Sequence, residues 1–234
     1  MPIPLYSIKD LFVSIRNEDI LTIKQFDIHR GACYVFEGRM GSGKTTLLDI
    51  LYNRRKTTRG EIKFEEKDIH QYSNREYKDQ IAIVPQIFHP PWGSVRKYMN
   101  KTIGKYSHIR NVEKKVDEIS RKMNMSYLLN RKINSLTPGE IRWVVLATMI
   151  GADCKVLFID EIELHLGKKD QKTLLSILHR KINYDGVTLI TSSHNKDLLS
   201  RIASVSITLE NGRITSVRSS GRKKDRYSNK KRNR

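Results

Sequence analysis

The sequence contains only two cysteines, Cys33 and Cys154, and no spacing of cysteine with histidine suggests a zinc site. They lie far apart in the chain, which excludes a disulfide framework and favours a reducing compartment. The longest run that leans apolar, 143–152, has about ten residues, whereas a membrane span needs about 20. The N-terminus lacks the basic and apolar segments of a secretory signal. We therefore expect a soluble chain that reaches a membrane only through a partner or its own surface.

Acidic residues are scarce, since 25 Asp and Glu stand against 44 Lys and Arg and give a formal charge of +19 over 234 residues. This length fits one large domain with a sizeable core. The segment 218–234 alone carries +8 and is otherwise mostly Ser, Gly and Asn, so we expect a disordered tail after a domain that spans 1–217. A solvated tail, contact with anionic lipid and non-specific contact with nucleic acid are three interpretations of it.

Hydrophobic periodicity predicts an α/β fold without internal repeats. Strands are expected within 4–37 and at 61–64, 81–84, 156–159 and 187–191. Helices are expected at 44–55, 111–129, from 138 onward, at 168–182 and near 196–202. Asn211-Gly212 marks a terminal hairpin. Strands that alternate with helices favour a mostly parallel sheet covered on both faces.

The strongest local signal is GRMGSGKTT, which fits the phosphate-binding pattern G-x-x-x-x-G-K-[ST] between a strand and a helix. Backbone N–H groups of such a loop, together with the positive end of the helix, bind phosphates. Lys44 would reach the β- and γ-phosphates and Thr45 would ligate Mg²⁺. The predicted nucleotide-binding residues here are Gly38, Arg39, Met40, Gly41, Ser42, Gly43, Lys44, Thr45 and Thr46.

Three further signals follow buried strands, where ligands bind in open α/β sheets. After VLFI, Asp160 is expected to hold Mg²⁺, and Glu161 to orient and deprotonate the attacking water. Gln86 ends IVPQ, and its amide would ligate Mg²⁺ or hold the water. His194 ends TLITSSH and would donate a hydrogen bond to the γ-phosphate, although a lone histidine is more often structural.

In this order, the motifs resemble those of the ATP-binding subunits of ABC (ATP-binding cassette) proteins across about 4–217. Gly38–Thr46 corresponds to Walker A, Gln86 to the Q-loop, LTPGE at 136–140 to the signature, VLFIDE to Walker B and His194 to the switch histidine. The resemblance implies a RecA-like core, an N-terminal antiparallel β part and a helical subdomain at about 87–135. It also implies an ATPase that uses Mg²⁺ and pairs head to tail, as a homodimer or heterodimer, around two ATP molecules.

The resemblance implies that Thr137 and Gly139 of the signature contact the ATP of the partner chain. Read locally, LTPGE is instead a helix start, with Thr137 as N-cap and Glu140 closing a capping box. Both interpretations are compatible, because a helix N-terminus binds anions. The signature departs from the family pattern at three places, and two positions outside it depart as well. Ile15 stands where an aromatic residue commonly stacks on adenine, and Gly167 replaces an aspartate of the dimer interface.

Glu140, in place of the usual glutamine, and the compact helical part resemble the group containing FtsE, LolD and MacB. This implies a cytoplasmic protein, peripheral on the inner face of the cell membrane, that drives an integral membrane partner in transport or cell division. An ATPase acting on nucleic acid or the translation machinery is the second hypothesis, and a regulatory cassette with weak turnover is the third. The aromatic loop at 87–99, with Trp92, either binds the partner or packs under its own subdomain.

Overall fold

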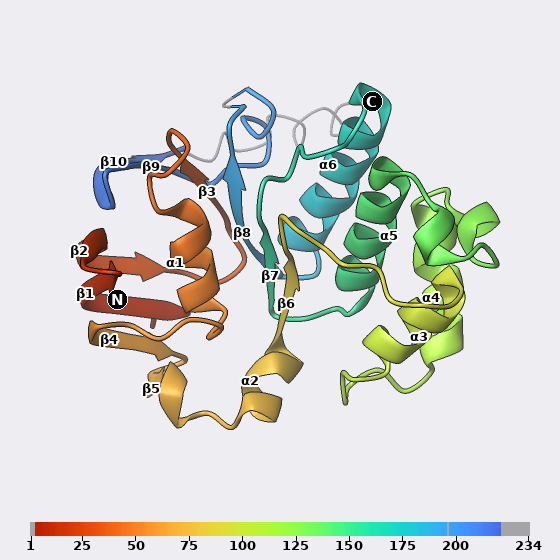
Figure 1. Cartoon of the computed structure of the whole chain (residues 1–234), viewed down its shortest axis with the longest axis horizontal. Coiled ribbons are helices and arrows are strands. Elements are labelled where there is room, and N and C mark those ends of the chain that lie inside the picture. The colour runs from red at the N-terminus through yellow and green to blue at the C-terminus, as the bar shows by residue number, and fades with distance from the viewer. Residues whose placement is uncertain (1–2, 196, 221–234) are drawn as a thin grey trace, which may run out of the picture.

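The computed structural model describes residues 3–195 and 197–220 and contains two sheets (Figure 1). The smaller sheet has the order β2-β1-β4-β5, and all of its strand pairs are antiparallel. Its strands are β1 (Tyr6–Ile15), β2 (Glu18–Ile28), β4 (Arg59–Phe64) and β5 (Lys67–Asp68). The antiparallel N-terminal part of the expected fold is therefore confirmed.

The larger sheet has the order β10-β9-β3-β8-β7-β6, and only the β9–β10 pair is antiparallel. Its strands are β3 (Cys33–Glu37), β6 (Ile81–Val84), β7 (Val156–Ile159), β8 (Thr188–Ser193), β9 (Val205–Glu210) and β10 (Arg213–Ser219). Every residue of β6, β7 and β8 is buried, as expected for parallel strands covered on both faces. The mostly parallel core is confirmed.

In the part of the chain that the structure describes, six α-helices cover the sheets or pack beside them. They are α1 (Lys44–Leu51), α2 (Asn74–Gln80), α3 (Val95–Ile103), α4 (Val112–Lys122), α5 (Pro138–Gly151) and α6 (Lys168–Asn183). Helices α3 and α4 pack against α5, and Figure 1 shows α3 and α4 at the side away from the smaller sheet. Within the described residues, no helix combines the length and the hydrophobicity needed to cross a bilayer.

Four predicted element extents were wrong. Helix α4 ends at Lys122 rather than residue 129, because the chain turns through Asn124 at φ 51°. Helix α1 ends at Leu51 rather than residue 55, because the chain turns through Asn53 at φ 57°, the left-handed conformation that commonly ends helices. Residues 197–202 form turns and not a helix. Strand β10 continues to Ser219, so Arg218 and Ser219 pair with β9 instead of belonging to a tail. The rest of the tail, 221–234, lies outside the described residues.

The carboxyl ends of four neighbouring strands lie at one edge of the larger sheet. The phosphate-binding loop follows β3, Pro85 and Gln86 follow β6, Asp160 follows β7, and His194 follows β8. Since parallel strands place these ends together, segments that are far apart in the sequence converge there.

Candidate functional site

The loop 38–43 joins β3 to α1 by a tight path that glycine alone permits at two positions. Gly38 has φ 152°, and a Cβ there would lie 2.2 Å from the Leu209 carbonyl oxygen. Gly43 has φ 97°, and its Cβ would lie 2.7 Å from Leu21 Cδ2. Both the backbone angles and the close neighbours exclude larger residues. The two glycines of the motif therefore allow β9 and β2 to pack against the loop.

The Lys44 ammonium group forms hydrogen bonds with the backbone of the loop. Its Nζ donates hydrogen bonds to the carbonyl oxygens of Gly38 at 2.9 Å and Arg39 at 2.8 Å. Burial lowers the pKa of Lys44, and the negative charges of Glu161 and Asp160 act in the opposite direction. Lys44 thus connects the loop electrostatically with the carboxylates that follow β7.

The first turn of α1 is free to bind an anion. Its N-cap, Gly43, makes no side-chain capping bond, and no acidic residue lies in the first turn. The N–H groups at such a helix end need acceptors and carry partial positive charge. Around them, Met40 is 89% exposed, Gly41 and Thr45 are exposed, and Ser42 is buried. The loop therefore presents an open, positively polarised cradle that suits phosphate.

Three predicted Mg²⁺ ligands line one cavity of about 180 Å³: Thr45, Gln86 and Asp160. Ser192 Oγ donates to Asp160 Oδ1 at 2.5 Å, which fixes that carboxylate. Hydroxyl, amide and carboxylate oxygens suit Mg²⁺, which keeps waters and phosphate oxygens as its other ligands. Within the described residues, no group of three His, Cys, Asp or Glu could hold a metal, so a cation here would also need neutral oxygens and phosphate. The donor set fits Mg²⁺ in the presence of phosphate.

Asp49 is a residue of this cavity that the motifs did not reveal. It lies one helical turn after Thr45 on α1 and lines the same space. Arg54 NH1 contacts Asp49 Oδ1 at 3.2 Å. Burial raises the pKa of Asp49, while Arg54 lowers it. Asp49 therefore adds a second carboxylate near Asp160, partly neutralised by its arginine.

Glu161 and His194 face each other. His194 Nε2 lies 3.2 Å from Glu161 Oε1. Glu161 has φ 49°, a strained angle for a residue with a side chain. The Glu161 N–H donates to Ser192 Oγ at 2.7 Å, and this hydrogen bond holds the strained backbone in place. The neighbouring His194 N–H donates to Glu163 Oε1 at 2.6 Å. The structure thus brings two of the four predicted catalytic residues into contact; Lys44 and Gln86 are the others.

Arg142 binds the backbone at this edge of the sheet, and no motif in the sequence marks it. It is 5% exposed. Its NH1 donates to the Pro85 carbonyl at 2.6 Å, and its NH2 donates to the carbonyls of Asp160 at 2.6 Å and Glu161 at 2.9 Å. Burial lowers the pKa of Arg142 to about 10, against the raising effect of the nearby carboxylates. One side chain of α5 therefore fixes both the segment before Gln86 and the two acidic residues.

The segment LTPGE is a helix cap in this structure. The Glu140 N–H donates to Thr137 Oγ1 at 3.3 Å, and the Thr137 N–H donates to Glu140 Oε2 at 2.9 Å, which completes a capping box. Arg131 NH1 pairs with Glu140 Oε1 at 2.8 Å. The Thr137 backbone and hydroxyl bonds and the charge of Arg131 hold the pKa of Glu140 below its usual value, although burial acts against them. The carboxylate that would oppose a phosphate is therefore turned back and paired.

Replacing Thr137 with Ala is expected to lower the free energy of unfolding by about 1 kcal/mol, because an N-cap is lost. Urea unfolding of parent and variant measures this. If Thr137 also contacts the ATP of a partner chain, the variant loses ATP-dependent dimerisation as well. A variant with unchanged stability would contradict the capping interpretation.

Some of the predicted nucleotide-binding residues lie outside this site within a single chain. Thr137 and Gly139 lie at the start of α5 and do not line the cavity of Thr45, Gln86 and Asp160. Ile15 ends β1, next to a turn through Arg16 and Asn17. It is half-buried against the hydrophobic core that contains Leu21 and Leu47. Its contact with a base stays a prediction.

Comparisons with known proteins agree with this geometry. A family model described as ABC transporter matches residues 21–163. A putative ABC transporter ATP-binding protein of Onion yellows phytoplasma is 23% identical over 202 residues, which cover 85% of this chain and 34% of that protein. The molybdate import ATP-binding protein MolC of Haemophilus influenzae is 26% identical over 192 residues, which cover 79% of this chain and 70% of that protein. The lipoprotein-releasing system ATP-binding protein LolD of Leptospira interrogans is 23% identical, with 91% of each chain covered.

Solved structures show the same fold at lower identity. A dimeric structure of MJ0796, a bacterial ABC transporter cassette, has a TM-score of 0.83 at 20% identity and covers 92% of this chain and 98% of that one. The structure of CbiO1 from Clostridium perfringens has a TM-score of 0.76 at 21% identity and covers 93% and 89% of the two chains. The matched relatives serve different transport systems, so they single out no subgroup. The chain belongs to the ABC transporter family, and it is the ATP-binding cassette of that family.

Proposed function

We propose that the protein binds and hydrolyses Mg-ATP and couples hydrolysis to movement of an integral membrane partner. One observation carries this proposal. At one edge of the sheet, the uncapped N-terminus of α1 lies together with the Glu161 carboxylate, which contacts His194. The first is a phosphate cradle and the second is a general base with an orienting group. Family membership supports both assignments.

Each side chain has a distinct role toward the substrate. Lys44, now bonded to two loop carbonyls, would exchange them for the β- and γ-phosphate oxygens. Thr45, Gln86 and Asp160 would hold Mg²⁺, which supplies positive charge to the transferring phosphoryl group. The loop N–H groups and α1 would bind the remaining phosphate charge. Catalysis then depends on positioning and electrostatic stabilisation, without a covalent enzyme intermediate.

Glu161 would accept the proton of the attacking water. The strained backbone at Glu161 is fixed by Ser192 and Arg142, so the carboxylate has a defined position. His194 contacts the same carboxylate and would donate a hydrogen bond to the γ-phosphate. The pair would therefore sense and cleave the terminal phosphate.

A head-to-tail dimer would complete the site. Thr137 and Gly139 begin α5 away from the phosphate loop of their own chain, yet they present a helix N-terminus. A second chain, either a copy or another cassette, would place this end against the bound ATP. The MJ0796 cassette, with a similar fold, was solved as a dimer. Gly167, an extended N-cap of α6 without a capping side chain, would leave this interface without its usual carboxylate.

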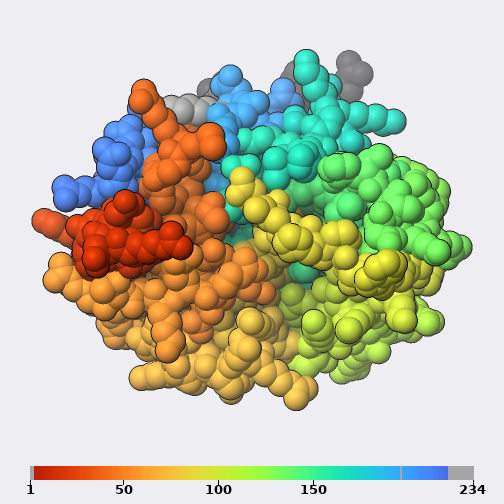
Figure 2. Space-filling view, in the orientation of Figure 1, coloured from red at the N-terminus to blue at the C-terminus, as the bar shows by residue number. Residues whose placement is uncertain are grey.

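The loop after β6 is the proposed docking surface for the membrane partner. Trp92 is 90% exposed and Ile87 is 71% exposed, so the alternative in which Trp92 packs under its own subdomain is wrong. Phe88 instead packs on Tyr98, with ring centroids 5.4 Å apart. Figure 2 shows this yellow segment lying across the surface between the orange N-terminal part and the green helices. The loop begins next to Gln86, so a partner here would be coupled to the Mg²⁺ site.

Replacing Trp92 with Ala is expected to leave ATP binding unchanged and to weaken co-purification with the membrane partner at least tenfold, since exposed aromatic anchors dominate such interfaces. Tyr184→Ala is the matched control, because Tyr184 is 80% exposed and follows α6. Equal recovery of the partner by the parent and the Trp92 variant would contradict the docking proposal.

The cellular role and location are proposed only from the resemblance to the group of FtsE, LolD and MacB. An FtsE-like role in cell division and a peripheral location on the cytoplasmic face of the cell membrane are proposals of this kind. Lipid contact by the basic tail remains a prediction, since 221–234 lie outside the described residues. A nucleic-acid ATPase and a weakly active regulatory cassette are alternatives. The second is opposed by the presence of Glu161 in contact with His194.

The function is tested by phosphate release from ATP, with Mg²⁺, by the purified chain alone and with its membrane partner. Measurable release is expected in at least one of the two preparations. Absence of release in both would overturn the ATPase proposal.

A further inference from the structure

A second cavity, of about 610 Å³, lies at the opposite edge of the larger sheet from the phosphate loop. It is lined by Lys155, which precedes β7, and by Gly186, Val187 and Thr188, which lead into β8. These are the amino ends of strands whose carboxyl ends carry Asp160 and His194. The volume lies in the range of about 300 to 1,000 Å³ that is typical of small-molecule sites.

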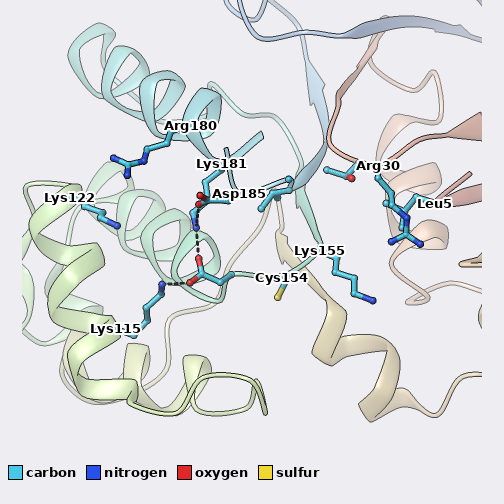
Figure 3. Close-up of a pocket in the computed structure, with 13 residues that line it drawn as sticks. Leu5, Arg30, Lys115, Lys122, Cys154, Lys155, Arg180, Lys181 and Asp185 are labelled. Carbon is cyan, nitrogen blue, oxygen red and sulfur yellow. Dashed lines mark hydrogen bonds and ion pairs between the residues drawn. The ribbon is translucent and has the colours of Figure 1, made fainter. Parts of the chain in front are cut away.

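The charged lining of this cavity is mostly basic. Six cations face two carboxylates, Asp153 and Asp185. The cations are Arg30, Lys115, Lys122, Lys155, Arg180 and Lys181. Figure 3 shows Arg180 and Lys122 on the side of the helices and Arg30 and Lys155 on the side of the sheets, with Lys181 between them. A lining with this excess of positive charge attracts anions.

Three carboxylates order this lining without neutralising its six cations, since Glu65, next to the lining, pairs with Arg30 at 2.6 Å and with Lys155 at 3.0 Å. Asp153 pairs with both Lys115 and Lys181, and Lys181 also contacts Asp185 at 2.8 Å. Burial lowers the pKa of Lys181, but its bonds to Asp153 and Asp185 raise it further, so the ammonium stays charged. These side chains are 17% to 30% exposed for Lys181, Lys115 and Asp153. The centre of the lining is therefore a fixed framework.

Two cations are left over to meet a ligand. Within the described part of the chain, no carboxylate lies within ion-pair distance of Lys122 or Arg180. Both are exposed residues in the last turns of α4 and α6. Helix ends alone would account for cations there. Arg30, Lys115 and Lys155 come from other parts of the chain and already pair with carboxylates, Arg30 and Lys155 with Glu65 and Lys115 with Asp153.

We propose that this cavity binds a small anion with two or more linked phosphate groups, at a site separate from the phosphate loop. Linked phosphates match the two unpaired cations, Lys122 on α4 and Arg180 on α6, together with the paired cations beside them. A single phosphate would reach only part of them. The lining offers few apolar side chains, so the phosphates and not a large ring system supply most of the recognition.

The site also joins elements that carry the ATPase machinery. Asp153 follows α5, the helix that begins at the signature and holds Arg142. Its partners Lys115 and Lys181 belong to α4 and α6. An anion bound beside these lysines would therefore lie at the junction of the three helices.

Calorimetric titration with inorganic tripolyphosphate tests the proposal at about 0.1 M salt, where the Debye length is about 10 Å. The phosphate loop also binds this probe, so the titration uses the full chain with Lys44→Ala. One equivalent is expected to bind to that variant, and two to the parent. Orthophosphate is expected to bind at least tenfold more weakly, since it forms fewer charge-assisted bonds.

Adding Lys122→Ala and Arg180→Ala to Lys44→Ala is expected to weaken tripolyphosphate binding at least tenfold. The matched control adds Lys114→Ala and Lys172→Ala instead. These remove the same charge from the same two helices, and neither residue lines the cavity. Unfolding temperatures without ligand show whether each variant is folded.

Three results would overturn the proposal: no binding to the Lys44→Ala chain, an equal loss in the matched control, or binding of a DNA duplex but not of tripolyphosphate. The first and third would leave ATP hydrolysis by the parent untouched. The second would show a general effect of net charge.

Discussion

Glu161→Gln is expected to lower ATP turnover by roughly 100- to 10,000-fold, the range in which general-base catalysis contributes. The amide keeps the size of the side chain and an oxygen that can contact His194, which lies 3.2 Å away in the parent. It cannot accept the proton of the attacking water. Binding of ATP should therefore persist while phosphate release stops. Steady-state phosphate release, with nucleotide affinity measured alongside, separates the two effects.

The matched control is Glu163→Gln, two residues further along. Its amide oxygen still accepts the hydrogen bond that the His194 N–H now gives to Glu163 Oε1. Turnover should fall by less than about tenfold, because one modest hydrogen bond is altered. Equal losses in both variants would show that the chemistry does not depend on Glu161 as a base.

Arg142→Met is expected to lower the free energy of unfolding by about 3 kcal/mol, because hydrogen bonds from a charged donor to three carbonyls are lost. Those carbonyls belong to Pro85, Asp160 and Glu161. Methionine fills a similar volume, so the loss reports the bonds and not a cavity. Urea unfolding measures it. Turnover should fall as well, since the segments of Gln86 and Glu161 lose their common support.

Two variants make the interpretation of Arg142 specific. Arg142→Lys keeps the charge but not the forked geometry, and intermediate losses are expected. Arg121→Met, on the exposed side of α4, should change stability by no more than about 0.5 kcal/mol. If Arg142→Met is as stable and as active as the parent, Arg142 does not hold the catalytic edge.

The sequence predicted those parts of the site that depend on local spacing. Gly38, Lys44 and Thr45 stand in a fixed motif, and the topology of a parallel sheet brings Asp160, Glu161 and His194 to the same edge. The capping box of Thr137 and Glu140 was predicted because it joins residues three apart. In each case, chemistry and spacing lie within one short segment.

Long-range contacts were not predictable in this way. Arg142 donates hydrogen bonds to carbonyls that lie 57, 18 and 19 residues away in the chain. Hydrophobic periodicity does not predict such distant partners. A cation directly before the apolar run of α5 was the only signal. The exposure of Trp92 depends on how Phe88 packs on Tyr98, which is also a tertiary matter. Helix α1 ended early because Asn53 adopts a left-handed turn, which the pattern of leucines does not reveal.

The most direct test of the account is the molar mass of the Glu161→Gln chain in solution, measured by light scattering with Mg-ATP and with Mg-ADP. The account predicts that the mass doubles with ATP, because the uncleaved γ-phosphate joins the phosphate loop of one chain to Thr137 of the other. With ADP the mass should stay that of one chain. A chain that binds ATP and remains a monomer, alone and with an equimolar partner cassette, would contradict the account.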